Sequence, residues 1–279
     1  MNRNSQMGMK GDTNVAPIIT LLSDFGNRDP YVGSMKGVIL SICRKARIVD
    51  ISHEISKFSV SHGAYVLASV VSYFPSGTIH VCIVDPGVGT KRKALIIKTR
   101  RDYLIGPDNG VLAFAANREG VELLIEITNS KYMRDEISST FHGRDIFSAV
   151  AAHLANGVPV MEFGRETNEF VQPDFSKPVQ NGGKLSGEII HLDDFGNVVT
   201  NISLEDIRKL GLSPGVSVKI LLGRAVHEVR FGMTYGDVVK GQAVALIGST
   251  GLLEISVNSG NASFSFKARE GSKVTISRI

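Results

Sequence analysis

Two side chains of opposite charge follow an apolar segment, one on each side of a sharp turn. Residues 79–84 read IHVCIV, which is typical of a buried strand, and Asp85 comes directly after them. The next four residues, PGVG, stop the strand, and Arg92 lies seven residues after Asp85. Open α/β sheets bind their ligands beyond the carboxyl ends of the strands. The spacing therefore predicts a site at Asp85 and Arg92, the alternative being a strand-capping aspartate and a surface arginine.

Two further loops in the first half of the chain carry groups able to bind or catalyse. Asp24 follows a predicted strand at 17–22, with Asp29 nearby, and its carboxylate suits the vicinal hydroxyls of a ribose or simply caps the loop. His142 lies in the segment FHGRD, just before a predicted helix at 146–156, for which Asp145 is the expected N-cap. A lone histidine is more often structural than catalytic, so both interpretations of His142 stay open.

A fourth loop, DDFGN at 193–197, opens the second half of the chain. Phe195 offers a face on which a flat heterocycle can stack, and Asn197 offers an amide that can read its edge. The alternative is an ordinary hairpin turn. Kinase chemistry is set aside despite two DFG triplets, because no glycine-rich loop or VAIK lysine precedes them. Walker A, HExxH and GxSxG motifs are absent, and the spacing of the aspartates does not support a metal site.

The first half of the chain alternates strands with helices, and these elements must position the loops. We predict strands at 17–22, 47–51 and 79–84, separated by helices at 31–43 and 60–74. Such alternation implies a parallel sheet. The predicted fold class is α/β, with an N-terminal α/β (Rossmann-like) domain followed by a smaller C-terminal all-β barrel domain.

The second half changes to short apolar segments, which favour a small barrel or sandwich. These segments span 185–192, 198–202, 216–222, 225–231, 243–247, 252–257 and 273–276. A stretch rich in glycine and proline separates the two halves. We therefore predict four parts: a disordered leader at 1–15, an α/β domain at 16–170, a linker at 171–183 and a β-barrel domain at 184–279.

Composition excludes several classes of protein. The 279 residues are 43% hydrophobic and carry a net charge of only +4, with scattered basic residues, so we expect no nucleic-acid partner. The longest apolar stretches are too short or too interrupted to cross a membrane, and the polar N-terminus is not a signal peptide. Cys43 and Cys82 form no metal or redox motif; two buried free thiols suit the reducing cytoplasm, which is the predicted location.

Seven ordered motifs, running from about residue 17 to the C-terminus, resemble one enzyme family. They read LLSDFGNRDPYVGSMKGVIL, ISHEI, VDPGVGTKR, GPDNGVL, TFHGRDIF, DDFGNVVTNI and IGSTGLLEISVN. In this order they are similar to the SAM hydroxide adenosyltransferases, which are adenosine-forming S-adenosyl-L-methionine (SAM) hydrolases related to the fluorinases and chlorinases. Seven motifs in one order make the resemblance far more specific than any one of them.

The resemblance implies a homotrimer that binds SAM between the N-domain of one subunit and the C-domain of the next. It places the water nucleophile on Asp85, Arg92 and His142. The residues that it implies for substrate binding are Asp24 for the ribose, Phe58 for the pocket wall, Asp193 and Ser249 for the methionine amine and carboxylate, and Phe195, Asn197 and the backbone near Asn258 for the adenine.

The expected reaction is in-line attack of water on C5′ of SAM, giving adenosine and L-methionine. Neutral methionine is an excellent leaving group, so the site must mainly orient a water and remove its proton, without metal or cofactor. Whether Asp85 or His142 takes the proton stays open. A metal-dependent phosphoesterase and a non-catalytic SAM or adenosine sensor are the alternatives.

At four positions this chain differs from what is expected of the halogenating relatives, and these positions bear on the choice of nucleophile and on substrate recognition. Those enzymes are expected to carry small hydroxyl or aromatic residues where this chain has Asp85, Val88 and His142. Desolvating a halide beside an anionic Asp85 is unfavourable, so we predict no halogenase activity. Thr250 stands where the halogenases have an arginine, which indicates that backbone N–H groups contribute more to carboxylate recognition here.

Overall fold

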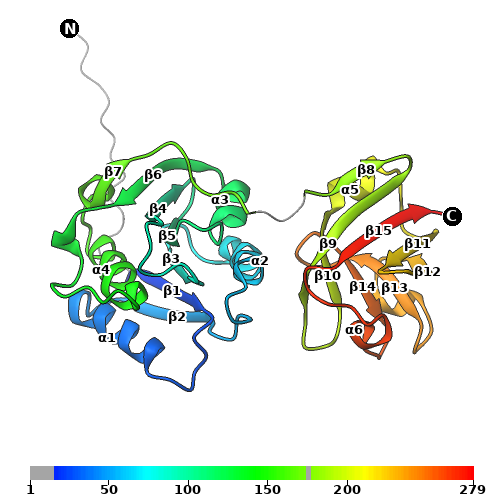
Figure 1. The fold of residues 1–279 in the computed structure, drawn as a ribbon, viewed down its shortest axis with the longest axis horizontal. Coiled ribbons are helices and arrows are strands. Elements are labelled where there is room, and N and C mark those ends of the chain that lie inside the picture. The colour runs from blue at the N-terminus through cyan, green and yellow to red at the C-terminus, as the bar shows by residue number, and fades with distance from the viewer. Residues whose placement is uncertain (1–15, 174–176) are drawn as a thin grey trace, which may run out of the picture. The chain divides into compact units, whose positions relative to one another are not determined.

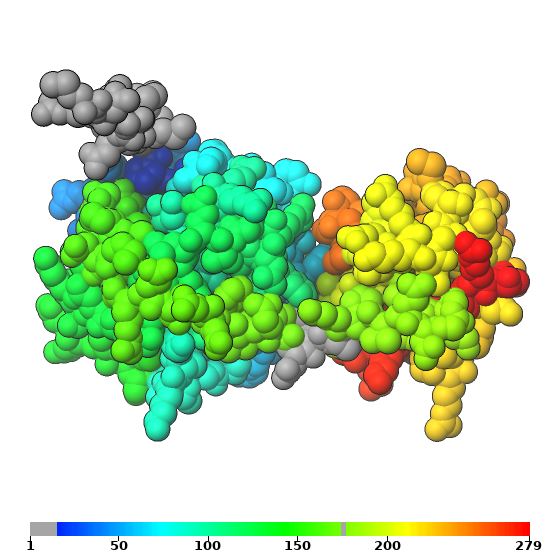
Figure 2. All heavy atoms as spheres, turned by 90° about the horizontal axis from the view of Figure 1, so that it is seen from above, coloured from blue at the N-terminus to red at the C-terminus, as the bar shows by residue number. Residues whose placement is uncertain are grey.

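The computed structural model describes residues 16–173 and 177–279, and these form two compact units that divide between Gln172 and Pro173 (Figure 1, Figure 2). The predicted leader at 1–15 lies outside the described residues, as does part of the predicted linker. Among the described residues, no helix combines the length and apolar character needed to cross a membrane.

The N-terminal unit is built on one mixed sheet of seven strands in the order β2-β1-β3-β5-β4-β6-β7 (Figure 1). Strands β1, β2, β3 and β5 run parallel to one another. The strands are β1 Ile18–Ser23, β2 Arg47–Ser52, β3 Ile79–Ile83, β4 Ala94–Thr99, β5 Tyr103–Pro107, β6 Val121–Ile127 and β7 Gly164–Glu166. The helices are α1 Tyr31–Ile42, α2 Val60–Val70, α3 Ala113–Glu119 and α4 Ala149–Ala155, with 3₁₀ turns at Val71–Tyr73, Ser130–Tyr132 and Val160–Phe163 and a π-helix at Gly143–Ser148.

The parallel arrangement predicted from the first three strands is confirmed for β1, β2 and β3, but two later strands of the sheet run antiparallel to them. β4 pairs antiparallel with both β5 and β6, and β7 pairs antiparallel with β6. The reason for β4 is the connection: only residues 100–102 separate it from β5, and a parallel crossover needs about a dozen residues or more. The mixed α/β class is confirmed, and the Rossmann-like description stays a prediction.

Two hydrophobic cores cover the two faces of this sheet. Successive residues of β1 point to opposite faces: Leu21 packs with Met35 of α1 and Phe147 of the π-helix, whereas Leu22 packs with Leu67 of α2. Helices α1 and α4 therefore lie on one face and α2 and α3 on the other (Figure 1). Because both faces are buried, the loops at the carboxyl ends of the parallel strands remain the place for a site.

The C-terminal unit is a closed barrel of seven strands, as predicted. The strand order β10-β14-β13-β12-β11-β15-β9 closes through the pairing of β9 with β10, and β8 extends the sheet from β9. The strands are β8 Val179–Asn181, β9 Lys184–Leu192, β10 Val198–Ser203, β11 Ser217–Leu222, β12 Ala225–Phe231, β13 Ala243–Ile247, β14 Leu252–Val257 and β15 Lys273–Arg278. Short helices α5 Leu204–Lys209 and α6 Ala262–Ser265 and a 3₁₀ turn at Tyr235–Asp237 complete the unit.

Candidate active site

The loop after β3 brings Asp85 and Arg92 into direct contact. Arg92 Nε donates to both carboxylate oxygens of Asp85 at 3.1 Å, and Nη2 donates to Oδ2 at 2.5 Å. Both side chains are nearly buried, with exposed fractions of 10% for Arg92 and 5% for Asp85. The Arg92 guanidinium also lies over the ring of Phe147, 5.3 Å from its centroid. Three hydrogen bonds and the contact with the Phe147 ring thus fix how the predicted pair is arranged.

His142 joins this pair through Arg92. Arg92 Nη2 lies 2.8 Å from His142 Nδ1, and since a guanidinium can only donate, Nδ1 is the acceptor. The hydrogen of the neutral imidazole is therefore on Nε2. Burial and then the positive charge of Arg92 lower the pKa of His142, while the charges of Asp85 and Asp145 act in the opposite direction. At neutral pH the site holds a carboxylate, a cation and a neutral imidazole.

The close approach of two loops explains how residues 50 positions apart meet at 2.8 Å. Gly89 has φ +78°, a conformation that favours glycine, and a Cβ built there would overlap the carbonyl oxygen of Ser139. The turn after β3 therefore packs directly on the segment that precedes His142. The glycines of PGVG do more than end a strand, because one of them permits this contact.

The expected role of Asp145 as a helix N-cap is wrong. The helix begins earlier, as a π-helix over Gly143–Ser148 with His142 at the N-cap position, and continues into α4. Asp145 lies inside its first turn and is fully buried. Its carboxylate accepts hydrogen bonds from the N–H of Ser138 and from Arg144, so it stabilises the preceding loop. π-helices are rare and are frequent at functional sites.

The lowered pKa of His142 gives a prediction for pH dependence. Protonation of Nδ1 would remove the acceptor for Arg92, but this needs a pH below the ordinary value of 6.5. We therefore expect kcat to decline only at pH values below 6.5, where His142 becomes protonated. Because the unfolded chain binds this proton first, the contribution of His142 to stability is present above pH 6.5 and is lost as pH falls. Kinetics between pH 5 and 8 measure the decline in kcat, and urea unfolding over the same range measures the loss of stability. A decline in kcat that begins above pH 6.5 would contradict the assignment of a neutral His142 imidazole.

Asp24 and Phe58 also meet, at the ends of β1 and β2. Asp24 is buried, its Oδ2 accepts the N–H of Phe58 at 2.9 Å, and its backbone carbonyl accepts the ammonium of Lys57. Phe58 has φ +64° and an exposed fraction of 71%. The arrangement holds one oxygen of a buried carboxylate and presents a phenyl ring to solvent. Asp29, by contrast, is exposed in the same loop.

In the C-terminal unit, the DDFGN segment closes into a turn between β9 and β10. Asp193 accepts the backbone N–H of Asn197 at Oδ1 and its side-chain amide at Oδ2, both at 2.8 Å. Gly196 has φ +83°, and Phe195 is 81% exposed. The hairpin interpretation and the stacking interpretation are therefore compatible, since the turn itself presents the phenyl ring.

Ser249 and Asn258 lie at the two ends of β14. Ser249 is exposed in a tight turn, in which Gly251 N donates to the carbonyl of Gly248 at 2.9 Å. The backbone of Asn258 is already engaged: its N–H donates to Gln242 at 3.0 Å, and its carbonyl accepts from Gly241 at 2.8 Å. Its side-chain amide donates to Val238 at 2.7 Å. Ligand contacts in this segment must therefore share these carbonyls or use neighbouring groups.

One polar cluster near these residues escaped sequence reasoning. Tyr235 donates to Oε1 of Glu254 at 2.8 Å, and Ser256 donates to the same oxygen at 2.8 Å. Glu254 is only 8% exposed, although it lies within a strand. Burial, then the hydrogen bond and charge of Glu254 and the charge of Asp193, raise the pKa of Tyr235 to about 12. The available signal was a glutamate inside the apolar run LLEISV.

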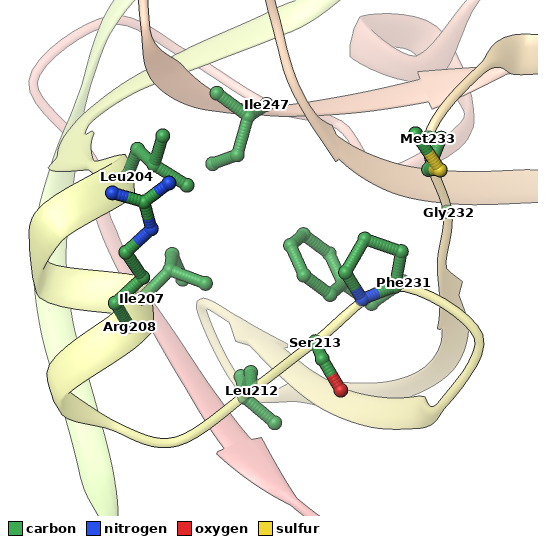
Figure 3. Close-up of a pocket in the computed structure, with 10 residues that line it drawn as sticks. Leu204, Ile207, Arg208, Leu212, Ser213, Phe231, Gly232, Met233 and Ile247 are labelled. Carbon is green, nitrogen blue, oxygen red and sulfur yellow. The ribbon is translucent and has the colours of Figure 1, made fainter.

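The barrel unit also contains a cavity of about 410 Å³ (Figure 3). Its walls are mostly apolar, with Phe231 facing Leu204 and Ile247 across the opening (Figure 3). None of the predicted site residues lines it, and its lining contains no carboxylate. The structure thus groups Asp85, Arg92 and His142, pairs Asp24 with Phe58, and pairs Asp193 with Asn197.

Comparison with known proteins gives a consistent result over both units. The SAM hydroxide adenosyltransferase N-terminal domain matches residues 19–164, and the corresponding C-terminal domain matches residues 187–275. A protein of Methanocaldococcus jannaschii named (R)-S-adenosyl-L-methionine hydrolase is 38% identical over 267 residues, covering 92% of this chain and 94% of the relative. A fluorinase of Actinoplanes is 29% identical over 291 residues, covering 94% and 98%. The crystal structure of an uncharacterized conserved protein from Thermotoga maritima has a TM-score of 0.88 at 39% identity, covering 93% and 100%.

Proposed function

Because the chain belongs to the SAM hydroxide adenosyltransferase family, we propose that it hydrolyses S-adenosyl-L-methionine to adenosine and L-methionine. The observation that carries this proposal is the contact of Asp85, Arg92 and His142 beyond the end of β3. A carboxylate, a cation and a neutral imidazole around one point can orient a water molecule and share the charge that develops on it.

The tautomer of His142 determines which residue donates a hydrogen bond to the water and which residue accepts its proton. Since Nδ1 accepts from Arg92, the imidazole offers Nε2–H to the water as a donor. The proton acceptor is then Asp85, whose carboxylate retains a lone pair beyond its bonds to Arg92. The oxygen of water forms a bond to C5′, the C5′–S bond breaks, and its electron pair goes to sulfur. The proton passes to Asp85 and then to solvent.

The leaving group explains why no other chemistry is needed. A sulfonium departs as a neutral thioether, so neither a general acid nor a Lewis acid has to stabilise it. Positioning is the main contribution, worth on the order of 7–11 kcal/mol in the best cases. A halide nucleophile would have to lose its hydration beside the carboxylate of Asp85, which disfavours halogenation.

Substrate recognition uses both units. Asp24 has Oδ2 bound to Phe58 N–H, which directs Oδ1 to the ribose hydroxyls, and the exposed ring of Phe58 lines the pocket. Four strands parallel to one another behind Asp24 and Asp85 support the Rossmann-like relationship. In the barrel unit, Phe195 stacks on adenine. The remaining proposed contacts are Asn197 and the segment at Asn258 for the adenine edge, and Asp193 and Ser249 for the methionine amine and carboxylate.

We infer that the active form is a homotrimer in the cytoplasm, with each site shared between the N-terminal unit of one subunit and the C-terminal unit of the next. The two free buried thiols, Cys43 and Cys82, support a reducing compartment. Light scattering of the purified protein is expected to give three times the chain mass of 30.1 kDa. A stable monomer with full activity would contradict a shared site.

The direct test is hydrolysis of SAM in ¹⁸O-water by chelator-treated protein, followed by mass spectrometry. Adenosine carrying ¹⁸O, together with free methionine, is the expected result, because water attacks C5′. Measurable SAM binding without product would favour a sensor. Activity lost in EDTA and restored by a divalent ion would favour a metallophosphoesterase. Added chloride is expected to give no 5′-chloro-5′-deoxyadenosine.

A further inference from the structure

The buried carboxylate of Asp145 gathers an unusual set of contacts just behind His142. Ser138 N donates to Oδ2 at 2.9 Å, and Arg144 donates to Oδ1 at 2.6 Å and to Oδ2 at 2.9 Å. Arg134 Nε lies 3.6 Å from Oδ1, and its backbone N–H donates to the carbonyl of Asp145 at 3.0 Å. We refer to Arg134, Ser138, Arg144 and Asp145 as the Asp145 cluster.

The Asp145 cluster encloses the segment that carries His142. Residues 133–141 form neither helix nor strand in the described chain, so side-chain contacts must define their path. The cluster holds this segment at Arg134 and Ser138, and the turn at Gly89 packs on Ser139. The π-helix starts immediately afterwards, where Ser148 Oγ donates to the carbonyl of Gly143 at 2.8 Å. His142 is thus fixed from both sides.

We propose that Asp145 is the positioning residue for His142, holding residues 134–142 so that the imidazole meets Arg92. Among the hydrogen bonds and ion pairs of the described residues, Asp145 contacts none of Asp85, Arg92 and His142, so it acts through the segment that carries His142. The kinetic part of this inference rests on the proposed function, whereas the placement of the imidazole does not.

The charge of Asp145 provides an independent readout. The charged groups that face His142 are Arg92, Asp85 and Asp145, and Asp145 raises the pKa of His142 against the effects of burial and Arg92. Burial acts to raise the pKa of Asp145 itself, but the bonds from Arg144 and Ser138 and the charges of Arg144 and Arg134 lower it overall. Asp145 therefore stays charged at neutral pH, and replacing it by a neutral isostere removes a negative charge beside His142.

The experiment compares wild type with Asp145→Asn by kinetics and by NMR titration of isotope-labelled histidine. We expect kcat to fall about 10- to 100-fold, as for a reacting group displaced by about 1 Å, with KM changed less than about threefold. The titration midpoint of the His142 imidazole should move to lower pH. A chain whose wild type does not hydrolyse SAM would refute the proposed function, but the ¹⁵N shifts of His142 in the same spectra would still test this inference, because they report whether Nδ1 keeps its hydrogen bond from Arg92.

Asp102→Asn is the matched control. Asp102 is also buried and accepts two backbone N–H groups, from Gly77 and Thr78, but it lies at the opposite end of β5 from the site. It should lower stability without moving kcat or the His142 midpoint. If Asp145→Asn fails to fold, Arg144→Gln serves instead, with about a threefold to tenfold loss in kcat expected. Wild-type kcat and an unmoved His142 midpoint in the folded variant would overturn the proposal.

Discussion

Replacing Arg92 by alanine is expected to reduce kcat for SAM hydrolysis by about 10²- to 10³-fold, the usual cost of removing one donor that stabilises a transition state. Arg92 is the only contact between Asp85 and His142 among the hydrogen bonds of the described residues. Its loss leaves a carboxylate with 5% exposure without its cation and frees the imidazole. KM should change much less, because Arg92 is proposed to bind the water and not SAM.

Two variants sharpen this measurement. Arg92→Lys keeps the charge but cannot span Asp85 and His142 with a planar fork, so an intermediate loss is expected. Arg118→Ala is the control: among the described residues, the side chain of this surface arginine donates to the carbonyl of Ala68 alone, at 3.1 Å, and its loss should leave kcat unchanged. A double-mutant cycle with His142→Ala should be non-additive, since the two side chains are 2.8 Å apart. Wild-type kcat in Arg92→Ala would rule out the proposed water site.

Replacing Asp24 by alanine is expected to weaken SAM binding about 10- to 150-fold, from a loss of about 1.5–3 kcal/mol for a hydrogen bond to a charged group. The physical reason is that Oδ1 is the oxygen proposed to bind the ribose, while Oδ2 accepts the N–H of Phe58. The variant also leaves the Phe58 N–H without its acceptor, which should loosen the proposed pocket wall. The rate at which bound SAM is hydrolysed (kcat) should fall by a smaller factor than the affinity for SAM.

Calorimetry with SAM and with adenosine distinguishes a ribose contact from a general loss of structure. Both ligands contain the ribose, so both should lose affinity by a similar factor in Asp24→Ala. Asp29→Asn, exposed in the same loop, is the matched control and should bind both ligands like wild type. Unchanged adenosine affinity in Asp24→Ala would contradict the assignment of this carboxylate.

The features that depend on neighbouring residues along the chain could be predicted from the sequence. The apolar run before Asp85 predicts a strand and places the carboxylate at its end, and the structure has β3 over Ile79–Ile83. The spacing of the apolar residues and the positions of the turn residues likewise predict the α/β unit and the barrel. Placement of Asp85, Asp24 and Asp193 on loops at strand ends follows from these elements alone.

Features that depend on tertiary contact could not be predicted from the chain. Arg134 and Ser138 reach Asp145 through a loop without periodicity, so the local pattern indicated a simple N-cap. A π-helix has no distinct hydrophobic period over six residues, and its start was therefore misplaced. The pairing of Tyr235 with Glu254 spans 19 residues and two separate elements, with only an acidic residue in a strand as a hint.

Phe58 combines an unfavourable backbone conformation with an exposed side chain. A phenylalanine in the left-handed region costs roughly 1–2 kcal/mol relative to a conformation that glycine adopts freely. The same residue leaves a large apolar ring 71% exposed, which gains little from burial in the folded chain alone. Selection for stability by itself would replace this residue by glycine. With the proposed role of Phe58 in the pocket, its presence is a trade-off in which backbone strain is tolerated for binding, and substitutions chosen to raise thermostability should leave position 58 unchanged.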